Sequence, residues 1–230
     1  MNNVVNIYLV RHGETDENRA MIMQGQLDTK LNAAGLEQAQ LAANALENVR
    51  FVAAYSSDLS RAAMTAQTII AKHPGVPLQT YKALRERHMG SLQGTKIDRS
   101  RRVGLPPDAE SAEAFSAQQQ HIQDGDDSKN ENENERTNIL VVSHGGLMHV
   151  LVQGLLSRGQ IKFEQSSKLG LLTRHWFPNA SVSVIELPVQ MHSSSDDRGV
   201  TMGMGTVVLF ADTTHLSVEF VNGNADIVDV

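Results

Sequence analysis

The amino-acid sequence predicts an α/β fold: a three-layer α/β/α sandwich with a mostly parallel central sheet and a small lid insertion. Short β-branched, apolar runs alternate with stretches of helical apolar spacing, which is typical of parallel strands joined by right-handed crossovers. The chain has 230 residues, 40% of them hydrophobic, so it can bury one sizeable core. We therefore expect a single domain over residues 1–230.

Near-continuous apolar runs predict strands that are buried on both faces of the sheet. These runs cover residues 4–10, 51–56, 138–143, 181–187 and 206–211. Helices are expected over residues 31–48 with Asn32 as N-cap, after Ser57 or Asp58 as N-cap, and from His144 to about residue 156.

Two stretches lack this pattern. Residues 123–137 are acidic, rich in Asn and without apolar side chains. We expect a disordered surface loop there, inside a lid insertion that covers about residues 91–137. Residues 191–205 are rich in Ser and Gly and predict a flexible hairpin connection.

The composition argues against several function classes. Asp and Glu number 26 against 20 Lys and Arg, and a net charge of −6 argues against non-specific binding to nucleic acid. The chain has no cysteine, hence no thiolate metal site and no cysteine nucleophile. Neither a signal peptide nor a run of ~18 apolar residues is visible, so we expect a cytoplasmic protein that does not bind membranes.

Two histidines directly follow predicted strands. His12 is followed by Gly13, and His144 is followed by Gly145. Because parallel strands end at the same edge of a sheet, the two histidines are expected to meet there. The glycines let a ligand approach the backbone closely. Taken singly, each histidine could be an unrelated residue at a strand end; together, and with Arg11 beside them, they favour a functional site.

Arg61 falls in the first turn of a predicted helix, where its charge opposes the helix dipole. A bound anion would reverse that penalty, because helix N-termini and guanidinium groups both favour phosphate. A neutral histidine can accept a phosphoryl group, and a general acid must then protonate the leaving alkoxide. Glu86 is the best candidate acid outside the predicted helix surfaces. The sequence has neither the P-loop pattern nor the HxH or HExxH spacing of metal sites, so we expect no metal and no other cofactor.

Several ordered motifs resemble the histidine phosphatase superfamily, also called phosphoglycerate mutase-like. They are Leu9-Val10-Arg11-His12-Gly13-Glu14-Thr15, Gln24-Gly25, Ser56-Ser57-Asp58-Leu59-Ser60-Arg61-Ala62, Leu84-Arg85-Glu86-Arg87-His88-Met89-Gly90, Val141-Val142-Ser143-His144-Gly145-Gly146 and Asn179-Ala180-Ser181-Val182. The resemblance covers most of the chain outside the lid and implies the phosphoglycerate mutase-like fold.

The resemblance also implies a role for each site residue. His12 would be the nucleophile that accepts the phosphoryl group. Arg11, Arg61 and His144 would hold the phosphoryl oxygens, and Glu86 would act first as acid and then as base. Four further residues are expected to bind substrate: Asn18, Gln24, Gly25 and Gly145. A basic cluster that includes Arg101 and Arg102 is open to two interpretations, a solvated helix face or a site for a second phosphate or carboxylate.

Within the family, residues 21–26 and 84–90 resemble the fructose-2,6-bisphosphatase branch of the glycolysis-and-apoptosis-regulator type. The lid is shorter than in mutases, which must exclude water, and this favours hydrolysis. We therefore predict a metal-independent phosphatase acting on a small phosphorylated metabolite, with fructose 2,6-bisphosphate as the leading substrate. Two alternatives stay open: a cofactor-dependent phosphoglycerate mutase, and a catalytically idle module that binds a phospholigand or a protein. The sequence leaves the oligomeric state open.

Overall fold

The computed structural model describes residues 3–97, 105–111, 114–115, 136–164, 177–194 and 197–216. Its strands are β1 (Asn3–Arg11), β2 (Phe51–Ser57), β3 (Leu78–Tyr81), β4 (Thr137–Ser143), β5 (Ile161–Phe163), β6 (Val182–Ser194), β7 (Asp197–Met202) and β8 (Gly205–Asp212). Its helices are α1 (Asp16–Ala20), α2 (Ala33–Leu46), α3 (Ser60–Ile70) and α5 (Gly145–Ser157), with 3₁₀ turns at Lys82–Leu84 and Gly90–Leu92. None of the described helices combines the length and the apolar character that a membrane crossing requires.

The strands form one eight-stranded sheet in the order β3-β2-β4-β1-β6-β8-β5, with β7 paired to β6. Strands β3, β2, β4 and β1 are joined by parallel pairs, and β5 and β8 also pair in parallel. Strand β6 pairs antiparallel with β1, β7 and β8. Within the described residues, β6 is therefore the strand that runs against the rest, and the predicted mostly parallel sheet is confirmed.

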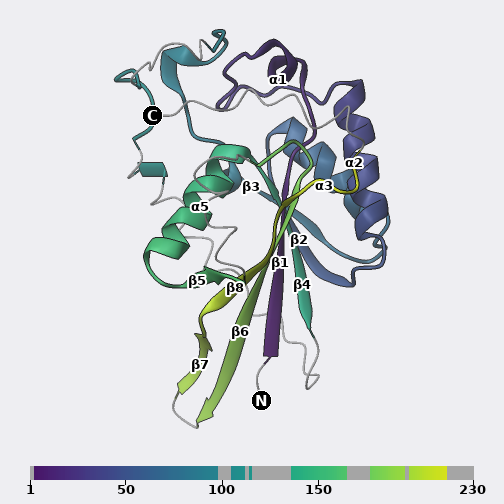
Figure 1. Ribbon diagram of the computed structural model, residues 1–230, viewed down its shortest axis with the longest axis vertical. Coiled ribbons are helices and arrows are strands. Elements are labelled where there is room, and N and C mark those ends of the chain that lie inside the picture. The colour runs from purple at the N-terminus through teal and green to yellow at the C-terminus, as the bar shows by residue number, and fades with distance from the viewer. Residues whose placement is uncertain are drawn as a thin grey trace.

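Helices cover both faces of this sheet (Figure 1), with α2 and α3 on one face and α5 on the other. Successive residues of a strand point to opposite faces, so β1 contributes to both cores. Val10 is buried in the core beneath α2 and α3, and Leu9 in the core beneath α5. The predicted three-layer α/β/α arrangement is confirmed.

The predicted N-cap residue is confirmed for α2 but not for α3. Asn32 caps α2 as predicted, since its side chain accepts a hydrogen bond from the Gly35 N–H at 2.8 Å. The predicted cap of α3 is wrong: its N-cap residue is Leu59, which has no capping side chain. Asp28, from a loop far away in the sequence, accepts hydrogen bonds from the Ser60 N–H and hydroxyl instead, at 2.6 and 2.9 Å.

The structure shows the hairpin that was predicted over residues 191–205, but most of it is regular strand. Strand β6 continues to Ser194, and β7 pairs with it antiparallel from Asp197 to Met202. The backbone hydrogen bonds of this ribbon depend little on side-chain type, which is why its Ser- and Gly-rich sequence did not reveal the length of its strands. The ribbon extends away from the body of the sheet, downwards in Figure 1.

The described part of the predicted lid packs against the segment that follows Glu86. The Glu110 N–H donates to the His88 carbonyl at 2.9 Å, and the His88 N–H donates to the Glu110 carboxylate at 3.0 Å. Phe115 is buried. Arg101, Arg102 and residues 123–135 of the predicted loop lie outside the described residues. The loop ends earlier than predicted, because Thr137 is the first residue of β4.

His73, just beyond α3, should make folding sensitive to acid. Its ring packs edge-on against Phe51, with centroids 4.9 Å apart, and burial lowers the pKa of His73 below its usual 6.5. The folded state then favours the neutral ring, so unfolding binds a proton and stability is lost as pH falls below the unfolded pKa. We expect His73→Leu to lose less unfolding free energy than the wild type between about pH 7.5 and about pH 5. Urea denaturation at both pH values measures this loss. An equal loss of unfolding free energy in the two proteins would contradict the prediction.

Candidate active site

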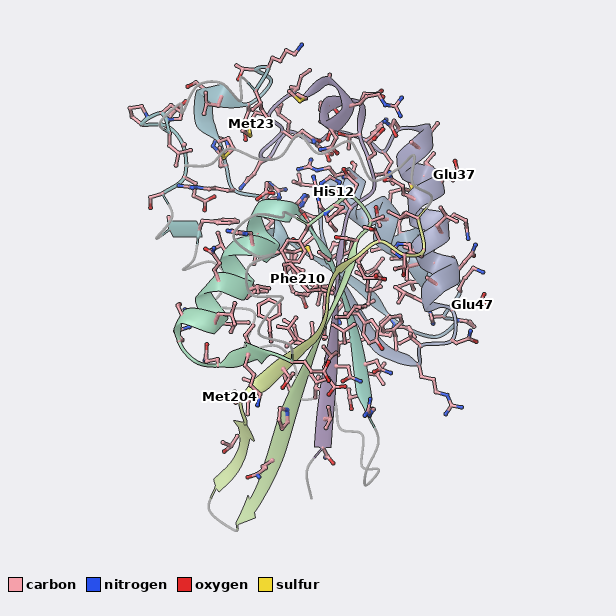
Figure 2. All side chains as sticks on the ribbon, viewed as in Figure 1. His12, Met23, Glu37, Glu47, Met204 and Phe210 are labelled. Atoms are coloured by element: carbon pink, nitrogen blue, oxygen red, sulfur yellow. The ribbon has the colours of Figure 1, made fainter. Side chains whose placement is uncertain are left out.

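His12 lies directly after β1, at the upper end of that strand in Figure 2 and far from the β6–β7 ribbon. Its ring is fully buried. The His12 N–H donates to the Ser143 carbonyl at 3.0 Å, while its carbonyl accepts from the Ala180 N–H and the Asn179 amide, both at 3.1 Å. The ends of β4 and of the segment before β6 therefore fix the position of this residue.

The hydrogen bonds of the His12 ring define its protonation state. Nδ1 lies 2.7 Å from the Gly13 carbonyl oxygen, which can only accept, so Nδ1 carries a proton. Nε2 receives the Nε–H of Arg61 at 3.3 Å, so it carries a lone pair. The ring is thus a neutral imidazole whose lone pair is on Nε2, the form that a nucleophilic histidine needs.

Arg61 is buried and tightly held next to this lone pair. Its guanidinium donates to the carbonyls of Gly25 and Leu27 at 2.8 and 2.7 Å, and to the Thr29 hydroxyl at 3.2 Å. These bonds place a fixed positive charge where an anion would meet Nε2 of His12. Gly25, together with its neighbour Gln24, was predicted to bind substrate.

The structure shows Gln24 and Gly25 supporting Arg61. The Gln24 side-chain oxygen accepts from the hydroxyl of Thr15 at 3.0 Å and from the hydroxyl of Thr29, which itself accepts from Arg61. The Gly25 carbonyl accepts directly from Arg61. Both residues thus belong to the site through the arginine that they hold.

His144 meets His12 as predicted. The two ring centroids lie 5.1 Å apart, and the His144 ring is fully buried. Burial, and then the nearby charge of Arg61, hold the pKa of His144 well below 6.5, so its ring is neutral. Neither ring nitrogen of His144 has a hydrogen-bond partner among the described residues. A buried polar group without a partner costs free energy, which an anion bound here would recover.

Two further donors surround this position. Arg11 is buried and donates to the Phe177 carbonyl at 2.6 Å. Gly145, the first residue of α5, has no Cβ, and one added there would stand 3.3 Å from Arg11 Nε. The Gly145 N–H is one of the first N–H groups of the helix, which have no intrahelical partner. Together with the helix dipole it favours an anion at this point.

Asn18 supplies another unused donor. Its side-chain oxygen accepts from the Thr15 N–H at 3.1 Å and from the Asn179 amide at 3.2 Å, which fixes the side chain. Its amide nitrogen is buried and lacks a partner within the described chain. This nitrogen is available to donate to a substrate, which is the role that the resemblance implies for Asn18.

Glu86 lies at the N-terminal end of α5. One carboxylate oxygen accepts from the Gly146 N–H and the other from the Arg87 N–H, both at 2.9 Å. A Cβ on Gly146 would come within 2.5 Å of this carboxylate, so a larger residue there would displace the carboxylate from this position. Glu86 is mostly buried and faces the same helix end as His144.

Two supporting residues to which the sequence analysis gave no role complete the site. The Gly13 N–H donates to the Thr65 hydroxyl at 3.1 Å, and the Glu14 N–H donates to the Gln38 side chain at 2.8 Å. Thr65 and Gln38 are fully buried polar residues of α3 and α2. Polar residues on the apolar face of a predicted helix were the signal that could have found them. Asn179 belongs to a motif of the resemblance but was not assigned to the site.

The loop after β1 also touches α2 backbone to backbone. A Cβ added to Gly35 would stand 2.0 Å from the Glu14 carbonyl oxygen, and one added to Gly13 would stand 2.4 Å from the Gly35 carbonyl oxygen. Real Cβ atoms do not approach backbone atoms so closely. Glycine at both positions is therefore a condition for this contact, which holds the loop after His12 against the start of α2.

Comparison with known proteins agrees with this geometry. Residues 7–190 match the histidine phosphatase superfamily (branch 1). A metal-independent phosphoserine phosphatase of Arabidopsis thaliana is 35% identical over 201 residues, which cover 80% of this chain and 77% of the relative. A broad-specificity phosphatase of Saccharomyces cerevisiae is 30% identical over 165 residues, covering 67% of this chain and 71% of the relative.

A solved structure shares the fold. The mycobacterial glucosyl-3-phosphoglycerate phosphatase, determined with VO3, has a TM-score of 0.64 and 26% identity, and the match covers 90% of this chain and 99% of that one. The family match spans most of the chain and includes every residue of the His12 site described above. The chain belongs to the histidine phosphatase superfamily, branch 1.

Proposed function

We propose that this phosphatase hydrolyses small phosphorylated metabolites through a phosphohistidine on His12, with arginine and histidine side chains in place of a metal ion. The observation that carries the proposal is the His12 ring, whose Nδ1 proton is held by Gly13 and whose Nε2 lone pair faces Arg61. The relatives named as metal-independent and broad-specificity phosphatases support it.

In the first step, the Nε2 lone pair of His12 attacks phosphorus. An N–P bond forms while the P–O bond to the leaving group breaks. Arg11, Arg61 and the ring N–H of His144 stabilise the charge that spreads over the phosphoryl oxygens. Glu86, in its acid form, gives its proton to the leaving alkoxide.

In the second step, water attacks the phosphohistidine. Glu86, now a carboxylate, takes a proton from this water as the new P–O bond forms. The N–P bond breaks, its electron pair returns to Nε2 of His12, and inorganic phosphate leaves. The hydrogen bond from Nδ1 to Gly13 keeps the ring in the same tautomer through both steps.

The substrate within this class follows from similarity. Residues 21–26 and 84–90 favour fructose 2,6-bisphosphate. The relatives add phosphoserine and glucosyl-3-phosphoglycerate, which occur in their names. All three are phosphate monoesters of small polar molecules, and they form the core of a substrate panel.

Turnover of this panel by the purified enzyme, with identification of each product, tests the proposal. We expect inorganic phosphate from at least one alkyl ester and a kcat/KM within the usual enzyme range of about 10⁴–10⁸ M⁻¹s⁻¹ for the best substrate. An isomerised ester from 3-phosphoglycerate, without free phosphate, would show a mutase. Binding without turnover across the whole panel would show a binding module instead.

Vanadate inhibition gives an independent check. Vanadate adopts the five-coordinate geometry of phosphoryl transfer, so it should bind far more tightly than phosphate, by ~10² or more. Inhibition constants for the two anions measure the ratio. Equal inhibition by vanadate and phosphate would mean that the site does not favour the transition state.

A further inference from the structure

Arg85 and Asp58 form a two-point ion pair next to the active site. Arg85 Nε and Nη2 donate to the two oxygens of Asp58, each at 2.7 Å. The side chains are 29% and 23% exposed, so the pair is partly shielded from water. The hydrogen bonds from Arg85 lower the pKa of Asp58, and those to Asp58 raise the pKa of Arg85. The pair therefore stays charged over the whole physiological pH range.

The pair connects two segments that carry different parts of the chemistry. Asp58 lies between β2 and α3, three residues before Arg61, whose guanidinium is fixed beside His12. Arg85 immediately precedes Glu86. One salt bridge thus connects the segment that positions Arg61, which would hold the phosphoryl group, with the segment that positions Glu86, the proposed acid.

Two other anchors of the Glu86 segment lie on the β4–α5 side, in addition to the contacts with Glu110 described above. The Ser143 hydroxyl donates to the Leu84 carbonyl at 2.9 Å, and the Gly146 N–H donates to Glu86 itself at 2.9 Å. These contacts tie Glu86 to the strand and helix that carry His144. The bidentate contact of Arg85 adds a tie to the α3 side, and a planar fork of this kind fixes both distance and direction.

We infer that Asp58 and Arg85 are a positioning pair, which sets the place of Glu86 relative to Arg61 and Nε2 of His12. The inference rests on the proposed function, because Glu86 must be the acid for its position to matter. Neither residue needs to touch the substrate. A misplacement of about 1 Å can cost about 10²-fold in rate, so loosening this pair should have a measurable effect.

The chemistry of the leaving group provides a readout that a merely structural role would not move. An alkoxide leaves slowly unless an acid protonates it, whereas p-nitrophenolate leaves readily without help. Since kcat/KM reports only the steps up to the first irreversible one, it reflects phosphorylation of His12 and not the later attack of water. A misplaced Glu86 should therefore lower kcat/KM for an alkyl ester and leave p-nitrophenyl phosphate nearly unaffected.

The test compares Asp58→Asn, Arg85→Gln and the double variant on phosphoserine, glycerol 2-phosphate and p-nitrophenyl phosphate. We expect each single variant to lose about 10–10²-fold in kcat/KM on the better alkyl ester and less than about 3-fold on p-nitrophenyl phosphate. The double variant should lose no more than the worse single one, because both break the same contact. Arg85→Lys keeps the charge without the fork and should fall between wild type and Arg85→Gln.

Lys72 and Glu47 form an exposed ion pair, 3.0 Å apart. Glu47→Gln is therefore a matched control, and it should leave kcat/KM unchanged for both kinds of ester. Equal losses on alkyl and p-nitrophenyl esters, or additive losses in the double variant, would overturn the inference. A rise in KM alone would do so too, since it would mean that Arg85 binds substrate. If the wild type hydrolysed neither kind of ester, the proposed function would fail instead. If the other variants are unstable, kcat/KM of Arg85→Lys on the two kinds of ester still tests the inference.

Discussion

Replacing His12 by Ala should abolish turnover while the fold remains. The substitution removes the nucleophile itself, and kcat/KM should fall by at least about 10⁴-fold, the scale on which a lost nucleophile is felt. The position of His12 depends on backbone bonds to Ser143 and Ala180, which alanine keeps. Steady-state assays on the best substrate measure the loss of turnover. Circular dichroism and a melting curve show whether the fold remains.

The covalent intermediate offers a direct check on the same residue. Wild-type enzyme quenched with substrate that is radiolabelled in the phosphoryl group should carry label that is stable to alkali and lost in acid. Because Nδ1 is occupied by its bond to Gly13, the label should sit on Nε2. His12→Ala should carry none. Label on Nδ1, or an alanine variant that still turns over, would refute the assignment.

Glu86→Gln should separate good from poor leaving groups. The amide is nearly isosteric but cannot give a proton, so kcat/KM for alkyl esters should fall by about 10²–10⁴-fold, the usual contribution of a general acid. The effect on p-nitrophenyl phosphate should be far smaller. Comparison of kcat/KM for the two ester types gives the answer.

Glu37→Gln, on the exposed side of α2, is the matched control for this change and should behave as wild type (Figure 2). A uniform loss on both ester types would show that Glu86 holds the site together and does not donate a proton. An unchanged enzyme would require another acid, and Glu110, whose carboxylate accepts from the His88 N–H, would be the next to test.

The sequence was most informative where local pattern and global fold agree. The five longer buried strands were predicted because near-continuous apolar runs have few other uses. The short strands β3 and β5 were not predicted, because four and three residues carry no detectable period. The cap of α3 was missed for another reason: Asp28 reaches it from a separate loop, and contacts between distant segments leave no local pattern.

The same distinction applies to the site. His12 and His144 were predicted to meet because strand ends of a parallel sheet share an edge, a rule that needs no distances. The supporting bonds could not be predicted in this way. Thr65 contacts Gly13 across 52 residues, and Asn179 contacts His12 across 167. These contacts depend on how the layers pack, and a polar side chain buried in a helix or turn is their only trace in the sequence.

The contact between Gly13 and Gly35 bears on how inherited changes in this chain should be interpreted. Gly35 has no side chain to contribute to chemistry, and it is 23 positions away from His12 in the printed sequence. Any larger residue there would nevertheless push the Glu14 backbone out of place and carry the neighbouring nucleophile with it. A missense allele at Gly35 should therefore present as the loss of an enzyme activity, much as an allele of the histidine itself would.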